Sequence, residues 1–239
     1  MKHENETITL AWCDGGMVHG KFAHSIMDVV LESGLPIKKV IRSVGGLVGK
    51  QRDNIMNTWY KHNVSDWILW VDSDIVLTVD KLKLLWEHAD KDTHKVISGV
   101  YFISFQKEDP MMEPVPCIFK DFVDHGVSTM RPVSGIDMEL NVTSFNGFEP
   151  DKLIEIAASG FGFLLIHRSV WEEVKKVCPQ DKSPFDGGFW STEDLPFFRY
   201  VKDAGIQAYA HTGATVEHMK TFSYDVNYYN EFWRGIIGI

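Results

Sequence analysis

The stretch Trp67-Ile-Leu-Trp-Val71, followed directly by Asp72-Ser73-Asp74, decides the fold. A continuous apolar run of this length is typical of a strand that is buried on both faces, as in a parallel sheet. Residues i and i+2 of an extended chain face the same side, so the carboxylates of Asp72 and Asp74 converge just beyond this strand. Ligands of open α/β sheets bind at that edge. The sequence therefore predicts a ligand site at the end of a buried strand.

Strand-like and helix-like segments alternate through the first hundred residues. Apolar residues recur at helical spacing between the strand-like runs, and Gly34 lies just past the end of the first helix. Because a helical crossover separates each strand from the next, we expect an α/β protein with a mostly parallel, Rossmann-like central sheet flanked by helices. The predicted strands are 7–13, 37–44, 67–71 and 95–103, and the predicted helices are 21–33, 49–62 and 79–89.

The alternation of strand-like and helix-like segments stops after residue 104. Residues 105–150 contain several prolines and two strand-like patches, 115–119 and 138–143, which predict a loop-rich insertion with a hairpin. The alternation then resumes and leads to an aromatic tail, 221–239, which is expected either to pack against the core or to close over a ligand. The later predicted elements are a strand at 160–166, a helix at 168–177, a helix at 194–204 and a strand at 206–210.

Length and composition exclude several classes of protein. A chain of 239 residues with 44% apolar and 24% charged residues suits one globular domain rather than disorder or collagen. No apolar stretch approaches the roughly 20 residues of a membrane span, and the polar, acidic N-terminus does not resemble a secretory signal. The net charge of −9 disfavours binding of long nucleic acids. Three widely spaced cysteines without metal-type spacing favour a reducing cytoplasm.

The paired aspartates point to a cation. Two carboxylates that lie close together repel each other unless a positive charge lies between them. Their hard oxygens favour Mg²⁺ or Mn²⁺, which often bridge a protein carboxylate to substrate phosphates. An ion at Asp72-Ser73-Asp74 would neutralise a diphosphate leaving group. The alternative is that both aspartates are ordinary exposed residues of a turn.

The chain as a whole resembles a known family of enzymes. It is similar to the family-2-like glycosyltransferases of GT-A fold found in bacteria and phages, with Asp72-Ser73-Asp74 as the DxD motif. The resemblance implies one domain over 1–239, with a nucleotide-binding half at 7–104, the insertion at 105–150, an acceptor half at 151–220 and the tail at 221–239. The other matching segments are Trp12–Val18, Gly49–Asn54, Ile97–Phe102, Ser159–Ile166 with Arg168, and Ser191–Asp194 with Phe198, Ala204 and Gly205.

The resemblance implies a metal site. Asp74 is the expected principal ligand, and Asp72 contributes to the site from a place nearer the ribose or the donor sugar. In many such enzymes the third ligand is a histidine shortly after a late strand. His218 matches that place, and His211 is the alternative. Because imidazole suits Mn²⁺ better than Mg²⁺, Mn²⁺ is the favoured ion.

The resemblance also implies a catalytic carboxylate. Transfer of a sugar with inversion needs a general base that takes the proton of the acceptor hydroxyl. Asp194 matches the family's catalytic acid, with Glu193 as its neighbour or substitute. The alternative is an ordinary helix start, with Ser191 or Thr192 as the cap and acids in the first turn. A retaining enzyme needs no such base, and Asp194 would then bind the acceptor.

Five further residues are expected to bind the donor. Arg52 would pair with phosphate or orient the DxD motif, and Asn54 would support the same loop, although Asp53 interrupts the family's Arg-Asn pattern. Gly160 and Gly162 would let the donor sugar approach the backbone. Asp14 would contact the base or the ribose. The structural alternatives are a solvated helix face at 52–54 and a strand bulge at 160–162.

These expectations combine into one predicted activity. The chain is predicted to be a metal-dependent glycosyltransferase of hexosyltransferase type (EC 2.4) that moves a sugar from a UDP- or GDP-type donor to a hydroxyl acceptor. The acceptor is a carbohydrate or another hydroxyl compound, with a modified DNA base less favoured by the acidic charge. The alternatives are a nucleotidyltransferase, for which Asp14–Lys21 is a poor phosphate loop, and a non-catalytic module that binds sugar nucleotides. A cytoplasmic location is expected, in the host if a phage encodes the chain.

Overall fold

A computed structural model describes residues 3–103, 115–122, 142–145, 147–186 and 192–219. Its centre is a seven-stranded sheet with the order β10-β13-β5-β12-β3-β1-β2. The described strands are β1 (Ile8–Asp14), β2 (Ile37–Val44), β3 (Trp67–Val71), β4 (Ile75–Val76), β5 (Val96–Val100), β6 (Phe102–Ile103), β7 (Val115–Pro116), β8 (Ile118–Phe122), β9 (Val142–Ser144), β10 (Leu153–Ile156), β11 (Ala158–Ser159), β12 (Phe163–His167), β13 (Ala208–Thr215) and β14 (Glu217–His218). The described helices are α1 (Gly20–Glu32), α2 (Val48–Lys61), α3 (Val79–His88), α4 (Arg168–Val177) and α5 (Asp194–Asp203).

The central sheet is mostly parallel. Strands β1, β2 and β3 pair in parallel, and so do β5 and β13. Strand β12 lies between these two groups and is antiparallel to both β3 and β5, while β10 is antiparallel to β13 at the edge. Both groups therefore run in the same direction, and the expected α/β class with a Rossmann-like sheet is confirmed.

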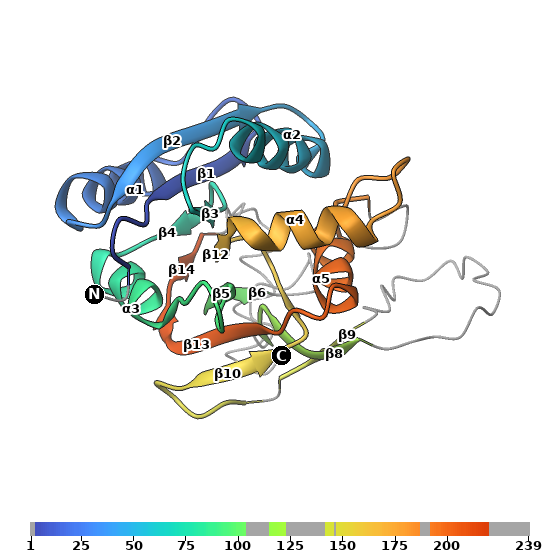
Figure 1. Cartoon of the computed structure of the whole chain (residues 1–239). Helices are drawn as coiled ribbons and strands as arrows, with labels where there is room; N and C mark the ends of the chain where they lie inside the picture. The colour runs from blue at the N-terminus through green and yellow to red at the C-terminus, as the bar shows by residue number, and fades with distance from the viewer. Residues whose placement is uncertain (1–2, 104–114, 123–141, 146, 187–191, 220–239) are drawn as a thin grey trace, which may run out of the picture.

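Helices cover both faces of this sheet. Helices α1 and α3 contact each other on one side, and α4 contacts both α2 and α5 on the other (Figure 1). Their apolar residues point inward at helical spacing, as in α4, where Val170, Trp171 and Val174 are buried. A sheet covered on both faces needs strands without polar alternation, and every residue of β3 and β5 is buried.

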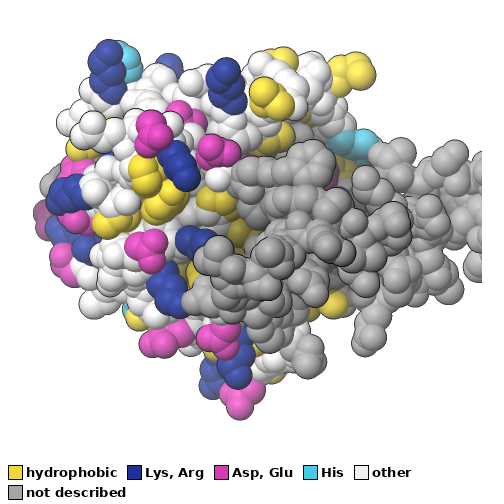
Figure 2. All heavy atoms as spheres, turned by 90° about the vertical axis from the view of Figure 1, so that its right-hand side faces the viewer, with side chains coloured by type: hydrophobic (Ala, Val, Ile, Leu, Met, Phe, Trp, Pro, Cys, Tyr) yellow, Lys and Arg dark blue, Asp and Glu magenta, His cyan; other side chains and the backbone are white. Residues whose placement is uncertain are grey.

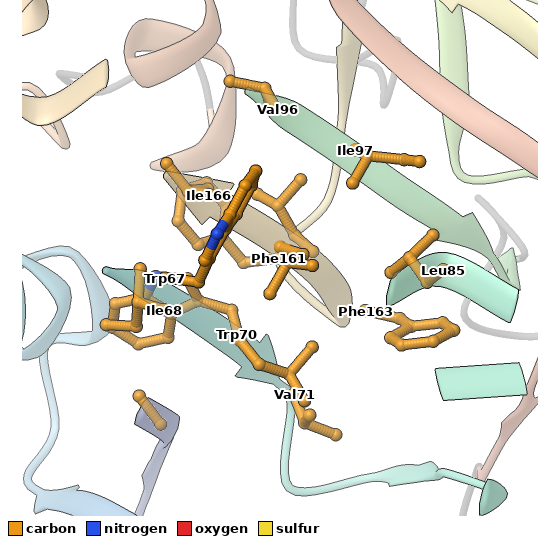
Figure 3. Packing of buried hydrophobic residues seen from close by; sticks show 14 of the residues in the cluster. Trp67, Ile68, Trp70, Val71, Leu85, Val96, Ile97, Phe161, Phe163 and Ile166 are labelled. Carbon is orange, nitrogen blue, oxygen red and sulfur yellow. The ribbon is translucent and has the colours of Figure 1, made fainter. Parts of the chain in front are cut away.

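The core is centred on β3, β5 and β12. Figure 3 shows side chains from these strands packing together, with Phe161 close to Trp70. The rings of Trp70 and Phe161 meet edge to face with centroids 5.6 Å apart. Burying a side chain of this size contributes about 1.5–3 kcal/mol, so the strand that precedes Asp72 is firmly held.

The carboxyl ends of several strands lie at one edge of the sheet. Strands β1, β3, β5 and β13 all end at this edge because they run in the same direction. Antiparallel β12 begins there instead, so the turn at 160–162 joins the same edge. The short pair β14–β4 then brings the residues after β13 back beside the residues after β3.

The insertion contains a small second sheet. Strand β8 pairs antiparallel with β9, and also with β11, which directly precedes the 160–162 turn. The hairpin expected from 115–119 and 138–143 is therefore present, with β9 shifted to Val142–Ser144. The rest of the insertion and the aromatic tail 221–239 lie outside the described residues.

Several predicted boundaries were wrong. The strand expected at 160–166 is divided, because residues 160–162 form a turn between β11 and β12. The strand expected at 95–103 is likewise interrupted at Tyr101, and the strand expected at 206–210 extends to Thr215. Strand β10 was not predicted, since three of its four residues are not fully buried at the sheet edge and Glu155 interrupts the apolar run. No helix in the described parts of the chain has the length and apolar character needed to cross a membrane.

Candidate active site

Arg52 is the centre of a cluster of carboxylates. Its side chain is only 3% exposed, and its guanidinium lies 4.5 Å from the ring centroid of Phe161. Nη2 donates a hydrogen bond of 2.9 Å to Oδ1 of Asp72, and Nη1 lies 2.9 Å from Oε1 of Glu193. Nη1 also donates to Oδ1 of Asp194. One buried cation therefore joins the carboxylate after β3 to the two carboxylates at the start of α5.

Close packing of two helix starts makes this possible. Arg52 lies in the second turn of α2, and Glu193 and Asp194 begin α5. A Cβ placed on Gly49 would lie 2.9 Å from the carbonyl oxygen of Phe185 and 3.3 Å from Cβ of Glu193. A glycine at this position lets α2 approach the segment before α5 closely enough for Arg52 to reach both acids.

The carboxylates at the start of α5 do not act as helix caps. Glu193 is the N-cap residue, yet its side chain makes no capping hydrogen bond. Both carboxylates contact Arg52 instead. Thr192 is exposed, and Ser191 lies outside the described residues. The helix-start alternative therefore does not account for the orientation of Glu193 and Asp194.

The cluster has an excess of negative charge. Three carboxylates surround one guanidinium, and Asp74 adds a further carboxylate two residues from Asp72. Burial raises the pKa of Asp72 above its ordinary value and Asp74 adds to the rise, whereas Arg52 opposes it. An anionic ligand such as a diphosphate could not bind beside these charges without an additional cation.

Asp74 faces His218. Oδ2 of Asp74 lies 3.0 Å from Nε2 of His218, and Nδ1 of His218 lies 2.7 Å from the carbonyl oxygen of Phe102. A carbonyl oxygen accepts only, so Nδ1 carries a proton. In a neutral imidazole, Nε2 then presents a lone pair toward the carboxylate. An imidazole lone pair and a carboxylate oxygen that face each other can either share a proton or bind a divalent cation between them.

Backbone pairing fixes this contact. Strand β14 pairs antiparallel with β4, so that His218 lies opposite Ile75. The N–H of Met219 donates a 2.7 Å hydrogen bond to the carbonyl of Asp74. The side chain of His218 is 9% exposed, while that of Asp74 is 45% exposed and open to a ligand. The fold thus joins the turn at residues 72–74 to β14, the strand after β13.

The donor set fits a metal that binds together with its substrate. No group of three or more His, Cys, Asp or Glu side chains among the described residues is arranged to hold an ion alone. Asp74 and His218 would supply two ligand atoms, and Asp72 lies two residues away at the same turn. Mg²⁺ and Mn²⁺ often use one or two protein ligands and complete their coordination with phosphate oxygens and water.

Asp14 lies at the end of β1, in a network of its own. Arg42 on the neighbouring strand β2 binds it through two nitrogens, at 2.6 and 2.8 Å. The indole of Trp12 and the N–H of Gly16 also donate to it. The hydrogen bonds from Arg42 are the main cause that lowers the pKa of Asp14. The structure therefore shows Asp14 ordering the loop after β1, and its contact with a nucleotide stays a prediction.

The glycines at 160 and 162 surround Tyr101. A Cβ on Gly160 would overlap Oη of Tyr101, and a Cβ on Gly162 would lie 2.7 Å from its Cε1 and Cζ atoms. Tyr101 is 4% exposed, and burial raises the pKa of its hydroxyl well above the ordinary value. The space at both glycines is thus occupied by Tyr101 in this structure, and approach of a donor sugar stays a prediction.

Two predicted residues lie elsewhere. Asn54 is exposed on α2, two positions from Arg52 and therefore on another face of the helix. His211 is buried on β13 with its ring centroid 4.3 Å from that of His88, and the N–H of Gly213 donates to its Nδ1. The structure brings neither residue to the carboxylate cluster, and it places His218, not His211, beside Asp74.

Comparisons with known proteins bear on the family and the fold. Residues 38–131 match the model of the family described as "Glycosyl transferase family 2". This match contains Arg52, Asp72 and Asp74 but ends before the residues of α5 and β14. The search of curated proteins finds no match.

Two solved structures are similar over most of the chain. The structure titled "Crystal Structure of A197 from STIV" aligns with a TM-score of 0.54 and 14% identity, over 90% of this chain and 86% of that one. The structure titled "Crystal structure of GalNAc-T7 with UDP, GalNAc and Mn2+" aligns with a TM-score of 0.54 and 10% identity. That alignment covers 92% of this chain but 45% of the other, so the chain spans about half the length of that relative.

The fold is GT-A, and the resemblance to family 2 glycosyltransferases is confirmed. In this GT-A fold, Arg52 joins Asp72 to Glu193 and Asp194, so parts of three of the segments matched from the sequence meet. Two residues that order this edge of the sheet, Arg42 and Tyr101, are not among the site residues that the sequence motifs predicted. Arg42 was not predicted, although its place on the strand beside Asp14 follows once β1 and β2 pair. Tyr101 was not predicted either, although it directly follows a buried strand.

Proposed function

We propose that the chain is a metal-dependent glycosyltransferase that transfers a hexose from a nucleotide-sugar donor to a hydroxyl acceptor with inversion. The main support is one arrangement of residues. Asp72 and Asp194 both bind the buried Arg52, while Asp74 faces His218 two residues further along the same turn. The proposed donor side, at Asp72, and the proposed acceptor side, at Asp194, thus both contact the side chain of Arg52.

Asp74, His218 and Asp72 would hold the metal, which is Mn²⁺ in preference to Mg²⁺ because an imidazole takes part. When bound, the ion supplies positive charge to the leaving diphosphate. The neighbour that was solved with UDP, GalNAc and Mn²⁺ supports this choice and favours a UDP-type donor over a GDP-type donor as the first to test.

Asp194 would act as the general base. Its side chain is 17% exposed, so it is open to an acceptor while still held by Arg52. The contact with Arg52 fixes the direction of the carboxylate, which would orient it toward the proton of the attacking hydroxyl. Glu193 shares the same guanidinium and is the neighbour that could replace it.

The acceptor would be a carbohydrate or another neutral hydroxyl compound. Figure 2 shows the face with α2, α4 and α5, where Lys and Arg side chains are mixed with Asp and Glu over the described part. A mixed surface of this kind does not suit a long polyanion. A modified DNA base is therefore the less favoured acceptor, and the cytoplasmic location stays a prediction.

The test is a donor screen with the purified chain. UDP- and GDP-sugars are incubated with Mn²⁺, Mg²⁺ or EDTA, and release of the nucleoside diphosphate is measured with and without a panel of glycosides. We expect metal-dependent release with one donor, and anomeric inversion in the product by NMR. Binding of nucleotide and metal without turnover across the panel would instead support a non-catalytic module. Release of pyrophosphate from a nucleoside triphosphate would support a nucleotidyltransferase.

A further inference from the structure

Tyr101 occupies the space between the glycine turn and the histidine that faces the DxD motif. It lies between the end of β5 and the start of β6, and its ring meets the ring of His218 edge to face, with centroids 5.3 Å apart at 82°. The next residue, Phe102, supplies the carbonyl that binds Nδ1 of His218. One short segment of chain therefore holds His218 in two ways.

The other side of Tyr101 leaves it no space to move. Gly160 and Gly162 approach its hydroxyl and ring so closely that a Cβ at either position would collide with it. Its backbone carbonyl accepts a hydrogen bond of 2.8 Å from the N–H of Cys117. Any side chain added at the turn would have to displace the ring, and the ring of His218 is one of its neighbours.

From these contacts we propose that Tyr101 is a positioning residue, and that Gly160 and Gly162 are glycines because they must admit its ring. The inference rests on the metal site proposed above. Tyr101 acts through His218 and does not touch the ion itself. By fixing the ring of His218, it keeps Nε2 directed at Asp74, as partners of metal-binding histidines do in other sites.

The two glycines allow a matched pair of variants. A methyl group at Gly160 meets Oη of Tyr101 first, and the next atoms, Cζ of Tyr101 and Sγ of Cys117, are both 3.0 Å away. Replacing Tyr101 with Phe removes the first collision. A methyl group at Gly162 meets ring carbons at 2.7 Å, which Phe retains. Tyr101→Phe should therefore rescue Gly160→Ala but not Gly162→Ala.

The measurement is Mn²⁺ affinity, determined with the full-length chain by the electron paramagnetic resonance signal of free Mn²⁺ and repeated with UDP present. We expect Gly160→Ala to weaken Mn²⁺ binding by about 10- to 100-fold, the range found when a supporting contact of a metal ligand is lost. Tyr101→Phe alone should bind almost as the wild type does. The Gly160→Ala/Tyr101→Phe double variant should recover affinity, and Gly162→Ala/Tyr101→Phe should not.

The possible failures can be told apart. If the wild type binds no Mn²⁺ with or without UDP, the proposed metal site is wrong and this inference falls with it. If the wild type binds Mn²⁺ and a folded Gly160→Ala variant binds it equally well, only the role of Tyr101 is overturned. A Gly160→Ala variant with a lower melting temperature but unchanged Mn²⁺ affinity would also overturn the role of Tyr101, because it would show that the turn affects only the packing of the protein.

A second variant covers the case in which Gly160→Ala does not fold. Tyr101→Leu keeps an apolar side chain at the buried position but removes the ring that meets His218. We expect weaker Mn²⁺ binding from this variant as well. Wild-type affinity in folded Tyr101→Leu would overturn the inference.

Discussion

Nε2 of His218 lies 3.0 Å from Oδ2 of Asp74, although 144 residues separate the two in the sequence. The contact exists because β14 pairs with β4 directly after the turn at residues 72–74. Asp74→Asn should therefore abolish Mn²⁺-dependent hydrolysis of the donor while the fold survives, since the side chain is half-exposed and a neutral amide is a poor metal ligand. Nucleoside diphosphate release and circular dichroism check the two parts.

A matched control exists on α1. Asp28 also lies 2.9 Å from a histidine, His24, and its side chain is 42% exposed. Asp28→Asn removes a similar pair away from the site and should leave hydrolysis unchanged. Full metal-dependent activity in Asp74→Asn would remove the metal assignment.

Asp194→Ala should separate chemistry from binding. If the carboxylate is the general base, turnover should fall by roughly 10²–10⁴ while the affinity for nucleoside diphosphate stays almost unchanged. Arg52 keeps Asp72 and Glu193 as partners, so the fold should persist. Steady-state kinetics and calorimetric titration with UDP provide the two values. Glu193→Gln is the comparison, with a smaller expected loss, and the reverse order would transfer the base role to Glu193.

Arg52→Met should destabilise the protein. It leaves three carboxylates without their shared cation, and these side chains are 17–32% exposed, so water can hydrate them in part. The loss should therefore be about 1–3 kcal/mol, below the roughly 3–5 kcal/mol of a fully buried broken pair. Chemical denaturation gives the value.

Arg168→Met is the control for this loss. The guanidinium of Arg168 lies 5.4 Å from the ring centroid of Tyr60 and is only partly buried. Its replacement should change the free energy of unfolding by less than about 0.5 kcal/mol, as surface substitutions usually do. Equal effects of the two variants would show that the carboxylate contacts of Arg52 do not stabilise the fold.

The buried His211 should make the free energy of unfolding decrease in acid. Burial lowers the pKa of His211 from 6.5, with help from His88 and Lys81 and against the effect of Asp151. The unfolded chain then binds the proton more readily, so stability is complete above the unfolded pKa of about 6.5 and falls as the pH drops below it. His211→Asn, which keeps an acceptor for the N–H of Gly213, should lose less stability between about pH 7.5 and about pH 5 than the wild type. Parallel curves would contradict the expectation.

The sequence predicted the parts of the site that follow directly from a regular element. The apolar run of β3 predicts both a buried strand and the position of Asp72 and Asp74 at its end. The helix starts that carry Arg52 and Asp194 were also predicted to within a residue. These features depend on local periodicity, which a single sequence contains.

Other parts depend on contacts between distant segments. Strands β4 and β14 have two residues each, too few for any pattern, and exist because they pair with each other. The direction of β12 could not be predicted, since an apolar run has no polarity. By contrast, spacing alone was enough to separate Arg52 from Asn54, because two positions on a helix differ by about 200° and therefore lie on different faces.

The position of β12 in the sheet affects how the protein is made. Strands β3 and β5 are neighbours along the chain, but they are joined in the sheet only through β12, whose residues are Phe163–His167. A nascent chain that has not yet emerged past His167 presents two open strand edges with nothing to bridge them. Before Phe163–His167 takes its place, β3 and β5 therefore expose unpaired edges, which are the kind of surface that makes partly folded chains prone to aggregation.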